Sequence, residues 1–440
     1  MLEELIAAAA GALFAALFAC VPGLHVCSVM GLLAMLLHGP VGAALPPAEV
    51  LVSAAMGMVV GYALANAIPA ILFAAPDDSA MFTVLPGQRY LMEGRGHEAV
   101  LLTGAGGFAG LLLLALCVVP WAPRALPRVF RVVAPHMHWM VWCVIAFMLL
   151  SEWPQTRPAV GTRLVRLLNG WKSVGAGLIV FLLSGMLGFI LAYRSPVDVH
   201  ASFQNLMPAF VGLFTLPWLV LNLVARVEIP PQSRDGRSAC RAATWLRGIG
   251  AGVAGGGFAA FLPAVTGGVG GLLAGHATAQ KDDEEFLISQ GAGKVVYYAG
   301  GFLLLFVPGL RLTRGGVAWI VTGLADTRSL DLYAPAVRAL LVGGLVAFLV
   351  LGPLTRGAIL LLGRVGYRHV SFWALAAACG TVAAATGWAG MLVAAVALGI
   401  GLIPPLYGCR RMNCLGVILL PVACGMSGLS GRIAEWLNLV

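Results

Sequence analysis

The stretch VPGLHVCSVMGLLA, Val21–Ala34, places a proline, a glycine and a histidine inside a long apolar run. Proline removes a backbone donor and glycine relieves steric limits, so Pro22 and Gly23 predict a break in a helix. If the run lies in a membrane, the backbone groups that the break frees need protein or a water-filled cavity beside them. The simpler alternative is a proline kink in which His25 bonds to a neighbouring helix.

The composition around this stretch indicates a membrane protein. The 440 residues are 60% hydrophobic and 10% charged, with a mean hydropathy of +0.93, whereas soluble domains carry about a quarter charged residues. Apolar stretches of about 18 or more residues recur along the chain, the length that crosses a bilayer as a helix. We therefore expect an all-α, multi-pass protein of the plasma membrane, with about 10–12 transmembrane helices, some re-entrant or broken. The N-terminal MLEELIAAAAGALF is expected to be its first membrane segment and not a cleaved signal peptide.

The net charge of +9 does not indicate nucleic-acid binding here. The arginines lie in short loops between apolar runs, the pattern by which basic cytoplasmic loops orient a membrane protein. The strongest basic loop contains Arg226, Arg234, Arg237, Arg241 and Arg247. Two further basic groups, 124–131 and 157–172, flank a single short apolar segment, so the rule leaves their orientation open.

The sequence lacks the motifs of an enzyme or a metal centre. Its nine cysteines show no C-x-x-C spacing and are expected to be small packing residues. It contains no H-E-x-x-H, P-loop or Ser-His-Asp pattern. GAGGFAG, Gly104–Gly110, follows no strand, so its glycines are expected at a close helix contact and not at a nucleotide. We expect no catalytic activity and no cofactor.

An internal echo indicates a duplicated unit. LPAVTGGVGGLLA, Leu262–Ala274, repeats the pattern of the opening stretch, with Thr266 where His25 stands. Each echo precedes an apolar run that ends near a proline, ILFAAPDDS or LLLFVPGLR. The two matches predict repeat halves at 1–225 and 248–440, joined by the basic loop 226–247. Interrupted segments at matching positions of two halves are typical of a transporter's binding site, and the pattern leaves open whether the halves are inverted or parallel.

Polar residues beside the breaks are candidate solute ligands. Asp77 and Asp78 can hold a cation or carry a proton; alternatively, Asp77 or Ser79 caps the next helix in an interfacial loop. Lys294 is either a buried counter-charge for an anion or snorkels to the interface. The substrate-binding candidates are Pro22, Gly23, His25, Ser28, Asn66, Ser79, Pro263, Thr266, Gly267, Gly268 and Lys294, with Asp77 and Asp78 coupling to Na⁺ or H⁺.

Two other features have structural alternatives. Glycines after Pro263 can present backbone amides to an anion, or they can allow close helix packing through Gly271 and Gly275. The charge run KDDEEF, 281–286, is expected to be a solvated loop in which Asp282 or Asp283 caps the following helix.

Four stretches spread over nearly the whole chain carry a resemblance. They are VPGLHVCSVMGLL (21–33), AIPAILFAAPDDSAMFTVLPGQRYLMEGRGHEAVLLTGAGG (67–107), FLPAVTGGVGGLLAGHATAQKDDEEFLISQGAGK (261–294) and LGIGLIPPLYGCRRMNCLGVILLPV (398–422). Their order resembles the large permease of the tripartite tricarboxylate transporters, the TctA-type family, and especially its archaeal-type branch. The part from Asp-Asp-Ser to Leu-Pro-Gly-Gln-Arg is the most specific.

The resemblance implies a duplicated permease that moves a carboxylate anion along an ion gradient, with a small membrane subunit and an extracytoplasmic binding protein. By position, it assigns Pro22, Gly23, His25, Pro263, Thr266, Gly267 and Gly268 to two broken-helix elements, with Asn66, Asp77, Asp78 and Ser79 beside the first. Tricarboxylate permeases proper carry a Glu- and Asn-rich segment where this chain has GAGKVVYYAGG. This departure leaves citrate-like specificity and the two partner proteins open.

Two hypotheses follow from these observations. The first is a secondary transporter that moves an anionic solute by alternating access around the two broken elements. The alternative is a translocase of a lipid-linked anion such as a polyprenyl phosphate, because helix breaks and a few basic groups also suit a phosphate headgroup. The expected partners are membrane lipid, a small or lipid-linked anion, and a second copy in a homodimer, with no nucleic acid.

Overall fold

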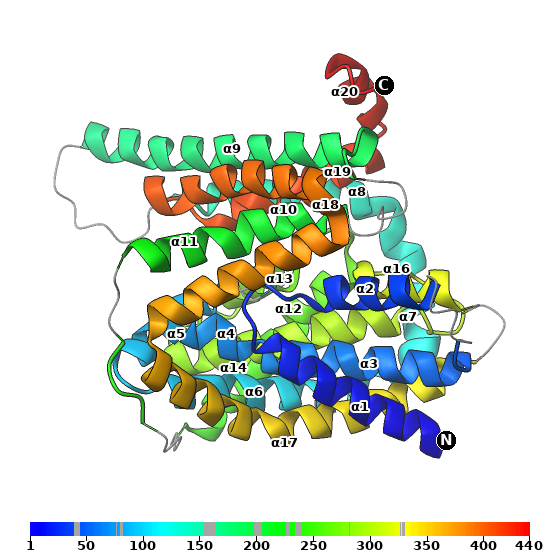
Figure 1. The fold of residues 1–440 in the computed structure, drawn as a ribbon. Coiled ribbons are helices and arrows are strands. Elements are labelled where there is room, and N and C mark those ends of the chain that lie inside the picture. Colours follow the sequence, from blue (N-terminus) through cyan, green and yellow to red (C-terminus); the bar gives the residue numbers. More distant parts are fainter. Residues whose placement is uncertain are drawn as a thin grey trace. The chain divides into compact units, whose positions relative to one another are not determined.

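The computed structural model describes residues 1–38, 45–75, 77–79, 82–153, 163–197, 205–225, 229–233, 240–280, 282–325, 327 and 331–440. These residues form helices joined by turns, with none in a strand, which confirms the all-α class (Figure 1). Eight of the described helices are long and apolar enough to span a membrane, or nine with the bent pair Arg411–Met426 and Ser430–Trp436. Reaching the expected 10–12 depends on shorter helices. Among the residues discussed above, Pro76, Arg157, Arg226, Arg234, Arg237 and Lys281 lie outside the described residues.

The chain divides into two compact units. The first contains Met1–Val132, Trp218–Phe261 and Thr266–Ala378, and the second contains Val133–Pro217, Leu262–Val265 and Cys379–Val440. Both predicted halves contribute to the first unit, so the compact units and the repeat are different divisions of the chain. The repeat boundaries at 225 and 248 stay a prediction.

The first unit holds most of the helices. They are α1 (Leu2–Ala19), α2 (Val26–His38), α3 (Ala48–Ala65), α4 (Ala67–Leu72), α5 (Val84–Met92), α6 (Gly96–Leu113), the π-helix η1 (Leu114–Val118), α7 (Ala122–Val133), α11 (Leu216–Val224), α12 (Ala242–Phe261), α13 (Gly267–Ala277), α14 (Asp283–Val295), the π-helix η5 (Val296–Gly300), α15 (Gly301–Leu303), α16 (Gly315–Leu324), α17 (Tyr333–Val365) and the first part of α18 (Tyr367–Tyr407). The ends of α7 and α11 extend into the second unit.

The second unit is built from the remaining helices. They are η2 (Ala134–His136), α8 (Met137–Leu150), α9 (Arg163–Tyr193), α10 (Met207–Phe210), η4 (Val211–Thr215), the rest of α18, η6 (Arg411–Leu415), α19 (Gly416–Met426) and α20 (Ser430–Trp436). Helix α18 is interrupted at Gly387, whose backbone (φ 62°) is not helical. Glu152 is buried and accepts hydrogen bonds from the Arg410 backbone and the Asn413 side chain, which ties α8 to the start of η6.

The two predicted helix breaks have the same backbone form. The first separates α1 from α2 and the second separates α12 from α13. In each, the residue after the proline has a positive φ: 90° at Gly23 and 61° at Ala264. Both breaks end one residue before the next helix, at His25 and Thr266. The structural match extends the echo seen in the sequence.

Glycine contacts fix the direction of the helices around each break. A Cβ on Gly57 or Gly61 of α3 would overlap the carbonyl oxygens of Ala8 and Ala12, so α1 and α3 run parallel. A Cβ on Gly252 or Gly256 of α12 would overlap those of Ser289 and Gly293, so α12 and α14 run parallel as well. Helix α1 therefore packs on α3, and α12 packs on α14, in each case through small residues four positions apart.

The two helix pairs point in opposite directions. Gly106 of α6 lies against Ile288 of α14, and Gly110 lies against Ala292. Residue numbers rise in the same direction along both helices, so α6 and α14 are parallel. Helix α17 is antiparallel to α6, from the pairs Gly104–Leu351 and Leu111–Gly344. It is parallel to α1, from the pairs Glu4–Arg338 and Ala12–Gly343. The pair α1–α3 is therefore antiparallel to the pair α12–α14, the relation expected of inverted repeats.

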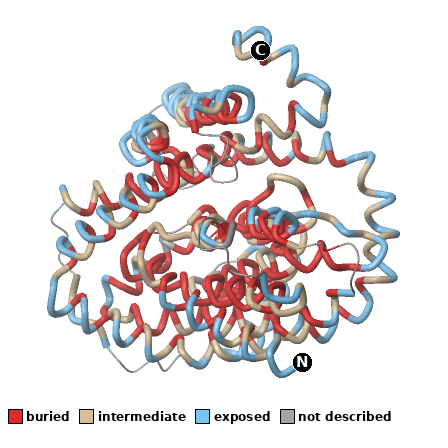
Figure 2. Tube along the Cα trace, turned by 45° about the vertical axis from the view of Figure 1, so that its right-hand side comes forward, coloured by how far each residue is buried: buried red, intermediate tan, exposed pale blue. Residues whose placement is uncertain are grey.

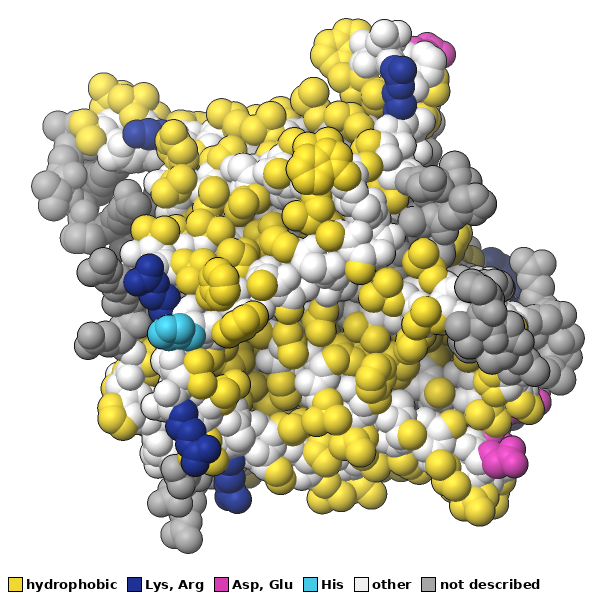
Figure 3. Space-filling model, in the orientation of Figure 1, with side chains coloured by type: hydrophobic (Ala, Val, Ile, Leu, Met, Phe, Trp, Pro, Cys, Tyr) yellow, Lys and Arg dark blue, Asp and Glu magenta, His cyan; other side chains and the backbone are white. Residues whose placement is uncertain are grey.

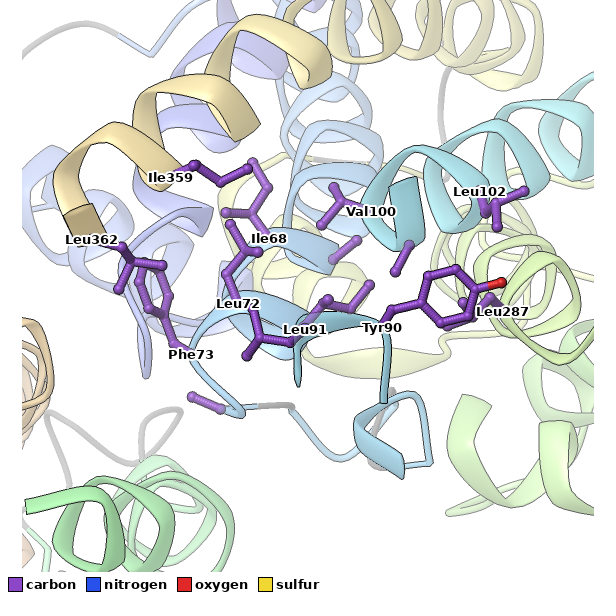
Figure 4. Close-up of a cluster of buried hydrophobic side chains, with 14 of the residues drawn as sticks. Ile68, Leu72, Phe73, Tyr90, Leu91, Val100, Leu102, Leu287, Ile359 and Leu362 are labelled. Atoms are coloured by element: carbon purple, nitrogen blue, oxygen red, sulfur yellow. The ribbon is translucent and has the colours of Figure 1, made fainter. Parts of the chain in front are cut away.

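Apolar packing fixes the end of α4. Ile68 and Leu72 lie in a buried cluster with Leu91 of α5, Val100 of α6 and Leu287 of α14 (Figure 4). Figure 2 shows buried residues concentrated among the inner helices, and nearly all of α3 is buried. The face shown in Figure 3 is dominated by hydrophobic side chains, as expected of a surface that meets lipid.

Candidate functional site

The segment that carries the acidic residues starts where α4 ends. Ala74 adopts a positive φ of 50°, and the Ala75 N–H donates to the Pro69 carbonyl, which closes the helix. The free carbonyl of Phe73 accepts bonds from the Tyr367 hydroxyl at 2.8 Å and the Asn222 amide at 3.2 Å. These bonds satisfy a buried helix end and direct the next residues, 77–79, into the interior of the first unit.

A buried ion pair lies at the centre of the site. Lys294, from α14, is 4% exposed, and its Nζ lies 3.0 Å from Oδ2 of Asp77, whose side chain is 9% exposed. Lys294 also donates to Oδ1 of Asn66, at the junction of α3 and α4. Asp77 accepts further bonds from the Ser79 hydroxyl at 2.7 Å and the Tyr62 hydroxyl at 2.8 Å. Its carboxylate is therefore surrounded by donors, as a buried charge requires.

His25 connects the first break to this pair. Its Nδ1 accepts the backbone N–H of Cys27 at 3.1 Å, so the neutral ring carries its proton on Nε2. Nε2 lies 2.8 Å from the Tyr298 hydroxyl, which lies 3.3 Å from Oδ2 of Asp77. The consistent order of donors runs from His25 through Tyr298 to Asp77. One side chain thus holds the start of α2 and contacts η5 of the other half.

Thr266 connects the second break to the same segment. Its hydroxyl donates to the Asp78 carbonyl at 3.4 Å, a longer bond than that of His25. Gly267 and Gly268 begin α13 and are buried. A Cβ on Gly267 would lie 3.1 Å from the Tyr297 ring, so this glycine lets α13 approach η5 closely. His25 and Thr266, which end the two breaks, therefore meet one cluster from opposite helix pairs.

The remaining candidates lie at different distances from this cluster. Ser28 is buried in the first turn of α2, and Pro22 and Gly23 form the break itself. Pro263 belongs to the segment Leu262–Val265 that groups with the second unit, so it is not placed relative to the cluster. The role of each candidate in binding a solute stays a prediction.

Several of the structural alternatives can now be decided. Lys294 is buried and paired, and it does not snorkel to an interface. Ser79 bonds to Asp77, and α5 begins after Thr83 with no side-chain cap. Asp282 occupies the N-cap position of α14 but makes no capping bond, while Asp283 pairs with Arg89 at 3.1 Å.

The glycines of 104–110 and 267–275 do serve helix packing. Gly106 lies against Ile288, and Gly271 lies against the side chain of Gln290. Gly275 has more room, because a Cβ there would lie 3.3 Å from its nearest neighbour, the Gln280 side chain. Close packing therefore explains the first two of these glycines without a ligand.

Two tyrosines of the site were missed from the sequence. Tyr62 lies four residues before Asn66 on α3, and Tyr298 lies four residues after Lys294. Residues four apart share a helix face, so each tyrosine had to project beside a residue already singled out. A spacing of four residues from a polar side chain within an apolar helix could have identified both tyrosines from the sequence.

The cluster has unbalanced charge. With both carboxylates ionised and His25 neutral, Asp77 and Asp78 carry two negative charges against one positive charge on Lys294. Ligand atoms of His25, Asp77 and Asp78 lie within 4.8 Å of one another. Oxygen and nitrogen atoms in this arrangement can hold a small cation or share a proton.

Comparison with known proteins identifies the family of the chain. Residues 5–416 match the model of the tripartite tricarboxylate transporter TctA family. The chain belongs to this family. It is also similar to the uncharacterized protein MJ1079 of Methanocaldococcus jannaschii, with 24% identity over 327 residues, 72% of this chain and 73% of the relative. No solved structure matches the chain.

Membership of the TctA family makes the chain a multi-pass membrane protein of a transporter family. The archaeal relative agrees with the archaeal-type branch that the motifs indicated. The permease role of the family is consistent with a protein that is not an enzyme.

Proposed function

We propose that this TctA-family protein is a secondary transporter that moves an anionic, carboxylate-type solute across the plasma membrane. The observation that carries the proposal is Lys294, a buried ammonium group held by Asp77 and Asn66 between two broken helices. An ionisable residue at membrane depth is a functional-site candidate by default, because its burial costs stability. A paired lysine at this position suits recognition of a carboxylate.

In this proposal, Asp77 and the carboxylate of the solute compete for the ammonium group of Lys294. The carboxylate of Asp77 is the counter-charge of Lys294 in the structure. A solute carboxylate that enters from either side exchanges with Asp77 and takes the ammonium group as its counter-charge. The N-termini of α2 and α13 begin beside the same cluster, and their positive dipole ends favour an anion there.

A further donor lies along the same face of α14. Gln290 is 4% exposed and lies one helical turn before Lys294. Its Nε2 has no hydrogen-bond partner among the described residues. A buried donor without a partner costs stability, and an anion that reaches it would satisfy it.

The charge balance supports coupling to a cation gradient. Displacing Asp77 from Lys294 leaves two carboxylates, Asp77 and Asp78, without a counter-charge. A proton or a Na⁺ ion that binds there with the solute removes the imbalance. Coupling to H⁺ or Na⁺ through Asp77 and Asp78 is therefore part of the proposal.

Alternating access is supported by the antiparallel helix pairs. Inverted repeats allow one element to open the site to each side in turn by equivalent motions. Assembly with a small membrane subunit and an extracytoplasmic binding protein is part of the proposal, because the matched family is that of a tripartite transporter. Formation of a homodimer is proposed as well.

Uptake by the purified protein in proteoliposomes tests the proposal. Labelled mono-, di- and tricarboxylates are offered with an imposed proton or Na⁺ gradient, and Lys294→Met serves as the inactive variant. We expect uptake of at least one carboxylate that collapses with the gradient. Uptake of no anion under any gradient would reject it. No observation favours the lipid-linked anion, and movement of a labelled polyprenyl phosphate without carboxylate uptake would establish that alternative.

A further inference from the structure

Helix α7 has two opposite faces. Its arginines, Arg124, Arg128 and Arg131, are spaced by four and three residues, so they project from one side. All three are exposed and make no ion pair among the described residues. Arg128 donates to the backbone carbonyl of Arg124, an uncharged acceptor. The helix therefore carries an unneutralised stripe of three positive charges.

The other face of α7 packs on the first unit. Ala122 is 5% exposed, and the Phe130 ring meets that of Phe261 edge to face at 5.9 Å. Ala122 and Leu126 also line an apolar cavity of about 90 Å³. A helix with three arginines in three turns cannot present that surface to hydrocarbon. The apolar part of the candidate span Ala122–Leu150 is therefore α8, and α7 needs another environment.

The position of α7 identifies that environment. The Tyr333 hydroxyl, at the start of α17, bonds to the Val119 carbonyl just before α7, and Gly309, beyond α15, lies beside Pro127. Membrane helices thus begin and end here, which places α7 at a membrane surface. Figure 1 shows α7 crosswise to the long helices α3 and α6 of the same unit. Asp331, two residues before Tyr333, accepts the Tyr333 backbone N–H.

We propose that α7 lies in the membrane interface and binds the headgroups of anionic phospholipids through Arg124, Arg128 and Arg131. An amphipathic helix in this plane places its basic residues among lipid phosphates. Exposed apolar residues flank the arginines, namely Trp121 at 65% and Val132 at 69%. Tryptophan beside a basic stripe is typical of the headgroup level. The inference does not depend on which solute the protein carries.

Lipid binding to the purified, delipidated full-length protein tests the proposal. Phosphatidylglycerol or phosphatidylcholine is added, and bound lipids are counted by native mass spectrometry. The variant R124Q/R128Q/R131Q removes the charge, and R124K/R128K/R131K keeps it. We expect wild type and the lysine variant to prefer phosphatidylglycerol. The glutamine variant should bind phosphatidylglycerol at least about tenfold more weakly than wild type.

Equal phosphatidylglycerol binding by wild type and the glutamine variant, with the same thermal unfolding, would overturn the inference. If the glutamine variant also lost an acidic protein that co-purifies with wild type, the stripe would be assigned to a protein partner. If wild type lost its preference for phosphatidylglycerol as NaCl is raised, the lipid-binding proposal would be supported, because exposed charges are screened by salt.

Discussion

The two helix breaks share a backbone form but differ in their chemistry. Both place a positive-φ residue after a proline and end at a polar side chain. The first break uses glycine at that position and ends in His25, which bonds at 2.8 Å to Tyr298. The second uses alanine and ends in Thr266, whose bond to the Asp78 carbonyl is 3.4 Å long. The two breaks therefore share the turn and differ in the side chains that end it.

This difference indicates unequal roles. His25 lies in a chain of hydrogen bonds that reaches the carboxylate of Asp77 through Tyr298. The side-chain hydrogen bond of Thr266 goes to the backbone of the same segment. We therefore expect the first break to affect the charged groups directly, and the second mainly to hold the position of the turn.

The largest effect is expected from the pair on which both breaks converge. Lys294→Met should lower uptake at least about a hundredfold, and it should destabilise the protein by roughly 3–5 kcal/mol, because Asp77 is left as an unpaired buried charge. Uptake in proteoliposomes and thermal unfolding in detergent measure the two effects. The exposed Lys172→Met is the matched control and should change neither.

A double variant separates transport from folding. Asp77→Asn with Lys294→Met removes both charges, so it should recover most of the lost stability without restoring uptake. If the double variant transported at the wild-type rate, Lys294 would be a structural residue and the proposed function would lose its main support.

The second largest effect tests the two breaks against each other. His25→Ala should lower uptake about tenfold or more, since it removes a hydrogen bond to a group that contacts the buried carboxylate. Thr266→Val removes only a long bond and should lower uptake roughly two- to threefold. Initial uptake rates at equal protein density measure both. Equal losses in the two variants would contradict the unequal roles.

The two tyrosines sharpen this comparison. Tyr298 joins His25 to Asp77, whereas Tyr62 donates to Asp77 at 2.8 Å without contacting the histidine nitrogens by a hydrogen bond. Tyr298→Phe should therefore lower uptake by about fivefold and Tyr62→Phe by about twofold. His25→Ala added to Tyr298→Phe should cost little more, because both changes interrupt one connection. Independent, multiplicative losses would show that no such connection operates.

The two breaks also show how much could be predicted from the sequence. Proline and glycine act on their own backbone, so both breaks, their equivalence and the all-α class follow from local chemistry. The pairing of Asp77 with Lys294 joins residues 217 positions apart, and no local pattern specifies such a contact. The antiparallel relation of the helix pairs also depends on which short segments cross the membrane, and a hydropathy pattern does not decide that.

Backbone geometry gives the smallest expected effect and the most direct test of the shared turn. Gly23→Ala places a Cβ on a residue with φ 90° and should destabilise the protein by about 1 kcal/mol. Ala264→Gly relieves the strain of an alanine at φ 61°, but glycine has greater freedom in the unfolded chain, and the two effects partly cancel. This variant should therefore lose at most about 0.5 kcal/mol of stability, or gain some. Denaturant unfolding of both purified variants measures the difference. A loss at position 264 as large as that at position 23 would mean that the two turns are not equivalent.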